Sequence, residues 1–390
     1  MRALKSVYLH SILIIWIFSL QQSLCADTYE KKTITPGVIY HRVYMQKGPW
    51  SINVLEVDLK EPTILLRTYK AGHNLIGRKK ISEMAIDMRG DDYEIIAGIN
   101  GDFFSREGIQ VGVQVMDGMI LSKPCGRSVF GLTDKKRPFI DIVDYDARVY
   151  TAEGKWYTIH TINDRREKDF LVLYNTFSSP TTLTNKWGTE VAIEILGKSV
   201  INDTIKGIVR QKETLRGNMQ IPSNGFILSG HDLGHNFLKN NILSGDTVKI
   251  YLGLPPIDEQ VSQVIGGVPR LIRQGRISVE YERESISEAF VTTRHPRTAI
   301  GFSKDSTKVF MMTVDGRQPG FSEGMSLYEL AEFLLDFGAN DALNLDGGGS
   351  TTMIIDDKIV NSPSDSAGER PVSNGLFIIK SKAPGDKVWY

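Results

Sequence analysis

The chain has 390 residues, of which 41% are apolar and 24% are charged, and its 46 Lys and Arg balance its 46 Asp and Glu. This composition is typical of a folded globular protein and excludes a disordered chain and a multi-span membrane protein. The balanced charge gives no basic field for nucleic acid, and two Cys are too few for a disulfide scaffold or a four-thiolate zinc site.

The first 26 residues have the pattern of a secretory signal peptide. A basic start precedes a mostly apolar run over 7–20, too short to span a bilayer well. We expect cleavage after Ala26. A lipid anchor on Cys25 is the alternative, which is less favoured because Leu24 is large for the position before a lipidated Cys. Either way we expect an extracytoplasmic protein (periplasmic, secreted or at the cell surface) with no transmembrane span in the mature chain.

The N-terminal half of the chain reads as strands with one short helix. Residues 27–89 form a β-rich segment in which a helix is expected over 81–88. Residues 150–260 show only weak strand patterns, and we interpret them as an inserted region or subdomain. Alternating and apolar runs predict strands over 51–57, 63–66 and 93–99.

The C-terminal third has clearer signals. Strands are predicted over 298–301 and 308–314. Ser326 and Glu329 form a capping box at the start of an amphipathic helix that Gly338 ends. Further strands are predicted over 342–345 and 350–355. A strand, helix and strand in this order predict one crossover unit, so we assign the chain to the α+β class, β-rich with mixed sheets and a few helices.

The loop after the strand over 342–345 is the strongest local signal for a ligand site. Gly347, Gly348 and Gly349 carry no Cβ, so their backbone N–H groups can approach an anion closely. Ser350 and Thr351 add hydroxyl donors, and Asp346 places a carboxylate at the rim. The alternative interpretation is a Gly-rich hairpin with a turn Asp.

Three other segments place charged or polar groups near strand ends. Arg294 and Arg297 stand just before or at a predicted strand, where a guanidinium can clamp a phosphodiester, although a solvated basic loop has the same pattern. Two further segments, Asn100-Gly101-Asp102 and Asp315-Gly316-Arg317, follow strands. Such acids could supply the carboxylates that a glycosidase needs, and the alternative is a turn with an Asx hydrogen bond.

Taken together, these residues resemble the phosphodiester glycosidase family. The resemblance covers about 90–380, is densest over 265–379, and its most specific stretch is Asn344-Leu345-Asp346-Gly347-Gly348-Gly349-Ser350. It also includes the segments 98–104, 265–272, 297–301 and 370–374. Asp102 stands where relatives commonly have Gly, and residues 150–260 match poorly. The resemblance therefore defines residues 90–380 as one glycosidase-like domain.

The resemblance implies cleavage of the glycosidic bond of a sugar 1-phosphodiester, similar to an N-acetylglucosamine 1-phosphodiester, in a glycan. It implies catalytic acids, for which we select Asp346, Asp315 and Asp102, with the first two stabilising the sugar or activating water and Asp102 also reading sugar hydroxyls. The substrate- and phosphate-binding set that it implies is Arg297, Arg294, Arg370, Asn100, Gly316, Gly347, Gly348, Gly349, Ser350 and Thr351.

Two other functions remain open from the sequence: a metal-dependent phosphodiesterase that breaks the P–O bond, and a non-catalytic protein that binds envelope glycan. No cofactor is required. Several Asp near a phosphate could bind Ca²⁺ or Mg²⁺, although no ligand spacing demands it. The expected partner is a sugar-phosphate or glycan, such as a teichoic-type or capsular phosphodiester or an exopolysaccharide, and not nucleic acid.

Overall fold

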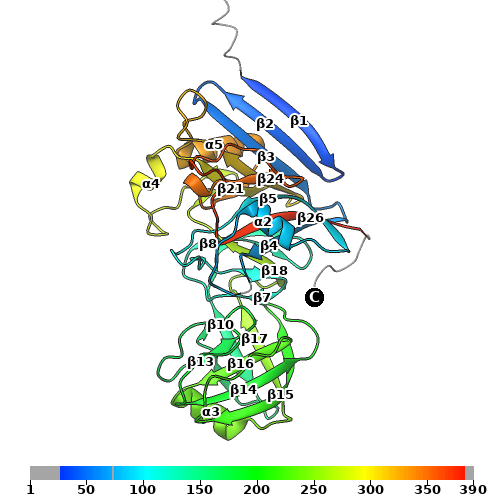
Figure 1. Cartoon of the computed structure of the whole chain (residues 1–390), viewed down its shortest axis with the longest axis vertical. Helices are drawn as coiled ribbons and strands as arrows, with labels where there is room; N and C mark the ends of the chain where they lie inside the picture. Colours follow the sequence, from blue (N-terminus) through cyan, green and yellow to red (C-terminus); the bar gives the residue numbers. More distant parts are fainter. Residues whose placement is uncertain (1–26, 73, 383–390) are drawn as a thin grey trace, which may run out of the picture.

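The computed structural model describes residues 27–72 and 74–382. The predicted signal peptide, including Cys25, lies outside these residues. The molecule is elongated, with a larger body built from both ends of the chain and a smaller β lobe at one end of the long axis (Figure 1). In the described part of the chain, no helix has the length and apolarity needed to cross a membrane.

The largest sheet of the body joins strands from both ends of the chain. β3 pairs with β22 along seven residues, so the segment 27–89 shares its sheet with the C-terminal third. In spatial order the sheet consists of β1 (Thr28–Thr35), β2 (Val38–Met45), β3 (Trp50–Asp58), β22 (Lys308–Val314), β21 (Arg297–Phe302), β23 (Asp341–Asn344), β19 (Arg270–Arg273) and β20 (Arg276–Ile277).

Two five-stranded sheets pack beneath this sheet. In spatial order the first consists of β25 (Lys358–Ile359), β24 (Met353–Ile355), β5 (Tyr93–Asn100), β26 (Asn374–Ser381) and β4 (Ile64–Lys70). The second consists of β7 (Met119–Ile120), β6 (Val115–Met116), β18 (Val261–Gly266), β8 (Ser128–Thr133) and β9 (Pro138–Ile142).

The β lobe is a separate eight-stranded sheet. In spatial order its strands are β11 (Trp156–Thr158), β10 (Asp146–Tyr150), β17 (Thr247–Gly253), β15 (Thr204–Thr214), β14 (Thr189–Ile195), β16 (Gly225–Gly230), β13 (Leu171–Tyr174) and β12 (Thr161–Ile162). Helix α3 (Leu233–Asn241) packs on β14 and β16. The β lobe therefore contains most of the region that matched the family pattern poorly.

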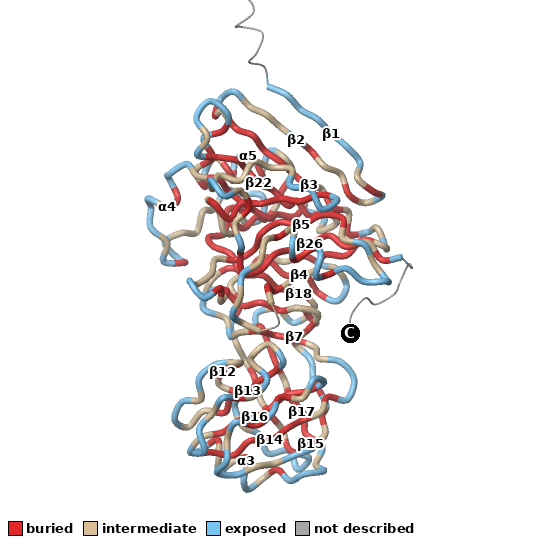
Figure 2. Tube along the Cα trace, viewed as in Figure 1, coloured by how far each residue is buried: buried red, intermediate tan, exposed pale blue. Residues whose placement is uncertain are grey.

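Apolar layers hold the body together. Helix α5 (Leu327–Phe337) covers one face of the largest sheet, with Leu330 and Leu334 buried against Ala299 and Met312. The opposite face packs on the β5 and β8 sheets, and helix α2 (Ile81–Asp87) covers the far side of the β5 sheet. Figure 2 shows this buried centre in red, with the exposed chain at the surface.

Several predicted elements are confirmed, and one is corrected. The strand predicted over 308–314 is β22, the helix begins at a Ser326–Glu329 capping box, and Gly338 ends it with φ +112°. The strand predicted over 350–355 was wrong at its start. The backbone N–H of Ser350 donates to Gly347 O and tightens residues 348–350 into a 3₁₀ turn, η1 (Gly348–Ser350), so that β24 begins only at Met353.

Candidate active site

The ends of β5 and β23 bring two predicted acidic segments together. The N–H of Asp346 donates to Gly101 O at 2.9 Å. Asn100 Nδ2 donates to Asp346 O at 2.6 Å, while Asn100 Oδ1 accepts from Thr298 and from the backbone of Thr352. Because both the nitrogen and the oxygen of its side-chain amide form hydrogen bonds within the protein, Asn100 holds the two strand ends in place. Its amide is therefore not free to bind the substrate, which corrects the prediction from the sequence.

Asp102 lies in a space that two glycines leave open. Its Oδ2 accepts a hydrogen bond from the N–H of Gly112 at 2.6 Å, and a Cβ on Gly266 would lie 2.6 Å from the same oxygen. Burial raises the pKa of Asp102 to about 7. The backbone N–H groups of Gly112 and Phe103 offset part of this effect, and the charge of Asp346 adds to it. The position where relatives commonly have Gly therefore carries a carboxyl that is protonated near neutral pH.

Asp346 is more accessible than Asp102 and titrates lower. It is half-buried at the start of the glycine loop. Burial raises its pKa to about 6, while Ser350 and the charge of Arg370 pull it down. The Ser350 hydroxyl lies beside the carboxylate but is not aligned for a regular hydrogen bond. Between about pH 6 and 7 the commonest state of the pair holds one proton, mainly on Asp102, and the two carboxyls titrate as a unit.

The glycine loop is not the open anion cradle predicted from the sequence. The N–H groups of Gly348, Ser350 and Thr351 donate to the carbonyls of Pro296, Gly347 and Gly348, which leaves them unavailable to a phosphate. The loop folds this way because its chain turns through η1. The hydroxyls of Ser350 and Thr351 are buried and find no hydrogen-bond partner among the described residues.

The glycines instead let two guanidinium groups approach the loop. A Cβ on Gly348 would lie 3.1 Å from Arg317 Nη2, and one on Gly349 would lie 2.1 Å from Arg370 Nη2. Arg370 forms a two-point ion pair with Asp365. Arg317 is exposed, and the one hydrogen-bond contact of its side chain within the described residues is to His295 Nδ1 at 3.4 Å. Of the two arginines beside the loop, Arg317 is therefore the one whose guanidinium is more available to a ligand.

Arg297 was predicted to clamp phosphate, but its side chain is turned into the protein. It is 2% exposed, its Nε donates to Met325 O, and its Nη2 donates to the carbonyls of Phe290 and Thr293. Burial, together with the charge of Arg317, lowers its pKa to about 10. Arg297 thus adds positive charge beneath the site and orders the segment before β21, without presenting these nitrogens to a ligand.

Phe290 links this arginine to an aromatic wall beside Asp102. Phe290 belongs to helix α4 (Glu288–Thr292), and its ring stacks on the Arg297 guanidinium at 5.1 Å. The Phe103 ring meets it at 6.1 Å between centroids. Both rings are half-buried. They provide an apolar surface next to the paired carboxyls, of the kind that packs on the face of a sugar ring.

Three further predicted residues have other roles. Arg294 pairs with Glu329 at the start of α5. Asp315 is buried, and its carboxylate accepts from Ser51, Asn361 and the backbone of Ser362. Gly316 makes room for the close approach of Pro296 and Gly324, because a Cβ there would lie 2.7 Å from Pro296 N. All three are engaged within the fold, which corrects their assignment to substrate contact or catalysis.

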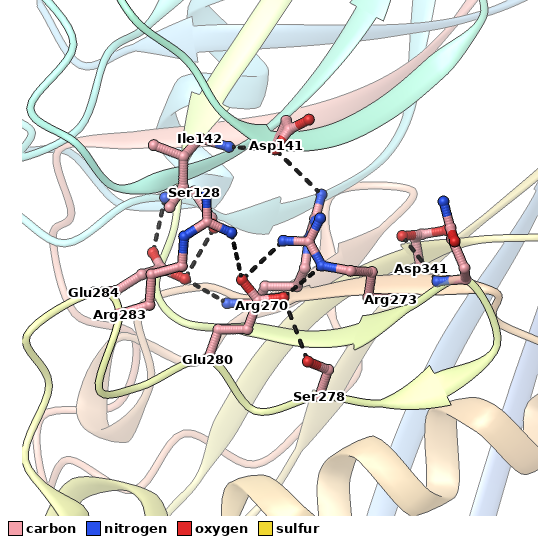
Figure 3. A network of polar contacts seen from close by, with 11 residues as sticks. Ser128, Asp141, Ile142, Arg270, Arg273, Ser278, Glu280, Arg283, Glu284 and Asp341 are labelled. Atoms are coloured by element: carbon pink, nitrogen blue, oxygen red, sulfur yellow. Dashed lines mark hydrogen bonds and ion pairs between the residues drawn. The ribbon is translucent and has the colours of Figure 1, made fainter. Parts of the chain in front are cut away.

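A buried polar network fixes the loop on the other side of Asp102. Glu284 accepts from the N–H and hydroxyl of Ser128 and from the N–H of Arg270 (Figure 3). Ser128 begins β8 directly after Arg127, whose charge lowers the pKa of Asp102. By anchoring the start of β8, the network fixes the backbone next to Arg127.

The site residues selected from the sequence do not include Arg317, Phe103, Phe290 or Arg127. Two of these four directly follow residues that were selected, since Phe103 follows Asp102 and Arg317 follows Gly316. The contact between Phe103 and Phe290 joins segments far apart in the chain, so no local pattern signals it. Within residues 27–72 and 74–382, no group of three or more His, Cys, Asp or Glu is arranged to hold a metal ion.

Comparisons with known proteins agree with the sequence resemblance. The family model of the phosphodiester glycosidases matches residues 189–379, a range that includes the glycine loop, Arg317 and Arg370. Just under half of the chain, 191 of 390 residues, is thus similar to the phosphodiester glycosidase family. The match also begins at β14, inside the β lobe.

Curated relatives match over short stretches. The N-acetylglucosamine-1-phosphodiester alpha-N-acetylglucosaminidase of Bos taurus is 35% identical over 112 residues, which cover 26% of this chain and 21% of the relative. An uncharacterized prophage-derived protein of Bacillus subtilis is 40% identical over 90 residues, or 23% of this chain and 14% of the relative. The matches thus span about a fifth or less of the length of these two relatives.

The fold itself has been seen in a solved structure. A hypothetical protein from Synechocystis superposes with a TM-score of 0.68 at 22% identity, over 91% of this chain and 64% of the other. A protein from Burkholderia pseudomallei K96243 superposes with a TM-score of 0.59 at 20% identity, over 86% and 75%. The glycosidase part therefore sits in an architecture shared along most of the chain.

Proposed function

We propose that the chain is an extracytoplasmic hydrolase that cleaves the glycosidic bond of a sugar 1-phosphodiester in a glycan. The observation that carries this proposal is the pair Asp102 and Asp346, two neighbouring carboxyls with pKa values raised to about 7 and about 6 beside the exposed guanidinium of Arg317. Two carboxyls whose environments separate their pKa values can act as acid and base in one pocket.

In this proposal the bond between the anomeric carbon and the phosphate oxygen breaks, and water supplies the oxygen that joins the sugar. A phosphate monoester is a good leaving group, so little protonation of the leaving oxygen is needed. The ionised Asp346 stabilises the positive charge that develops on the sugar and takes the proton of the attacking water. The protonated Asp102 donates a hydrogen bond next to it and keeps the pair from carrying two negative charges.

The phosphate and the sugar take opposite sides of the pocket. Arg317 and Arg370 flank the glycine loop and would hold the phosphate oxygens, for which the planar guanidinium is well suited. Phe103 and Phe290 would face the apolar side of the sugar ring. The described residues present no metal cluster, and a divalent cation stays a prediction from the sequence alone.

The extracytoplasmic location rests on the sequence of residues 1–26. A basic start, a short apolar run and Ala26 before a polar stretch predict export, and glycans with sugar-phosphate linkages are found on that side of the membrane. Expression of the whole chain, followed by N-terminal sequencing of the exported protein, tests it. The expected N-terminus is Asp27, and retention of residues 1–26 would overturn the proposal of a cleaved signal peptide.

Hydrolysis in ¹⁸O-labelled water tests the bond that is cleaved. With N-acetylglucosamine 1-(methyl phosphate) as the substrate, the proposal expects the label in the sugar and none in the phosphate. Label in the phosphate would favour the metal-dependent phosphodiesterase. Binding without turnover by the native chain would favour the glycan-binding protein. Asp346→Asn serves as the control for contaminating activity, since that variant should release no sugar.

A further inference from the structure

Two hollows are lined mainly by residues of the β lobe and by none of the candidate active-site residues. One of about 680 Å³ is lined by Thr176, Ser179 and Gln220 among others. A second of about 500 Å³ is lined by residues that include Tyr174 and Thr182. The segment 174–183 contributes to both hollows, so they adjoin one another. Both hollows have many neutral polar side chains in their lining, and the 500 Å³ hollow adds the charged Asp164, Arg165 and Arg166. This lining suits a ligand with hydroxyl, amide and anionic groups better than an apolar ligand.

Arg166 holds the wall of the 500 Å³ hollow in a fixed shape before any ligand binds. Its Nη1 donates to Ser229 Oγ at 2.8 Å, and its Nη2 donates to the carbonyls of Asn185 and Trp187 and to Asn185 Oδ1. No carboxylate lies within ion-pair distance of Arg166 in the described parts of the chain. These bonds hold the 185–187 loop in one shape, so ligand binding there would cost little ordering entropy.

Exposed apolar side chains rim this loop. Trp187 is 59% exposed, Leu183 is 77% exposed and Leu215 is 58% exposed. Both leucines have a left-handed backbone, with φ of +52° and +59°, a conformation that costs a bulky residue free energy and concentrates at ligand-binding loops. The N–H of Leu215 donates to Gly188 O at 2.8 Å and joins the two loops. The indole of Trp187, two residues beyond Asn185 in the lining of the 500 Å³ hollow, is an exposed surface on which a sugar ring can stack.

The hollow is also linked to the candidate active site through one loop. Asn163, in the lining of the 500 Å³ hollow, donates from Nδ2 to Leu121 O at 3.0 Å. Asn175 donates from Nδ2 to Ile120 O at 2.8 Å. From Leu121 the chain runs within six residues to Arg127, whose charge acts on Asp102. The segment from Ile120 to Arg127 therefore connects the lining of the hollow with a residue whose charge acts on Asp102.

We propose that the β lobe holds a second binding site, formed by the 500 Å³ hollow and Trp187, for the sugar units of a polymeric N-acetylhexosamine phosphodiester. This inference rests on the proposed function for the identity of the polymer. It makes the substrate a long glycan that is held on the lobe while one linkage is cut in the body. A protein partner would use the apolar rim without the polar hollow.

Binding in a catalytically disabled chain tests this site on its own. In an Asp346→Asn background, a poly(N-acetylglucosamine 1-phosphate) chain is the probe, measured by affinity electrophoresis. Trp187→Ala should weaken binding about five- to tenfold, the loss typical of a central Trp in a binding site. Trp156→Ala is the matched control: Trp156 is also exposed (55%) and also stacks with a cation, but it lies on β11 at the opposite edge of the lobe sheet.

Kinetics separate this inference from the proposed function. In the active chain, Trp187→Ala should raise KM for the polymer five- to tenfold with kcat unchanged, and leave a single-repeat substrate unaffected. Equal binding by Trp187→Ala and Trp156→Ala, or no retention of the polymer by any variant, would overturn the lobe site. If the polymer binds through Trp187 but the active chain never releases sugar, the lobe site stands and the proposed hydrolase function fails.

Discussion

The candidate active site and the β-lobe hollow differ in how far their key side chains are exposed to solvent. Asp102 is 2% exposed and lies between glycines, so its pKa is raised. On the lobe, Trp187 and Leu183 are exposed to solvent, while Arg166 holds the 185–187 loop in place. Chemistry at neutral pH requires desolvated acids, and recognition of a chain requires an accessible, pre-ordered surface. In this molecule the two hollows therefore indicate where a ligand can bind, and they do not coincide with the residues that we propose as catalytic.

The largest expected effect comes from removing the accessible carboxylate. Asp346→Asn should lower kcat by about 10³-fold, since a positioned acid or base contributes roughly 10²- to 10⁴-fold. The substitution keeps the shape of the side chain, and thermal unfolding should show the native transition. Retention of more than a tenth of the activity would mean that Asp346 does not act on the substrate.

Filling the space beside Asp102 tests whether its burial matters. The Cβ introduced by Gly266→Ala would lie 2.6 Å from Asp102 Oδ2 and must push the carboxyl aside. We expect a loss of activity of about 10- to 100-fold, as misplacement of a catalytic group produces. In an Asp102→Asn background the same substitution should cost much less, which a double-mutant cycle measures. Additive losses would mean that Gly266 serves only the packing of β18.

The two arginines near β21 offer a matched comparison of phosphate binding. Arg317→Ala should raise KM about tenfold, because a charge-assisted hydrogen bond to phosphate contributes roughly 1.5–3 kcal/mol. Arg294→Ala, which removes a guanidinium already paired with Glu329, should leave KM unchanged. Equal effects of the two variants would show that general positive charge, and not the position of Arg317, attracts the substrate.

The smallest expected effect is on stability. Because the folded-state pKa of Asp102 is raised above its unfolded value, the folded chain binds more protons between about pH 4 and 7. Its free energy of unfolding should therefore fall as the pH rises through this window. Asp102→Asn should remove the part of that fall that Asp102 contributes, while the raised pKa of Asp346 still produces a fall up to about pH 6. Above pH 7 the variant should be more stable than the native chain by at most roughly 4 kcal/mol. Denaturant unfolding at pH 4.5 and pH 8 checks the difference.

The sequence predicted what local patterns determine. The strand over 308–314, the Ser326–Glu329 capping box and the Gly338 helix end all depend on near neighbours, and all were found. The strand ends that carry Asp102 and Asp346 also come together, through a hydrogen bond between Asn100 and Asp346, which are 246 residues apart, and the roles of the two acids stay a prediction.

The errors in the predicted site came from tertiary burial. Arg297 reads as a basic residue at a strand start, but Phe290 and Met325 enclose it and their carbonyls take its hydrogen bonds. The glycine loop was predicted to be an anion cradle, but the N–H groups of Gly348, Ser350 and Thr351 donate to backbone carbonyls of the protein. In both cases the residue type correctly indicated a positive charge or a space without side chains. Only the packing decides which atoms remain available to a ligand.

The separation of the two carboxyl pKa values is the central claim, and site-resolved titration tests it most directly. Carboxyl ¹³C NMR of the native chain should show the Asp346 and Asp102 pair releasing its two protons with apparent pKa values near 6 and 7, and Asp346→Asn should lower the pKa of Asp102. Two independent titrations near pH 4, with Asp102 indifferent to Asp346→Asn, would contradict the account.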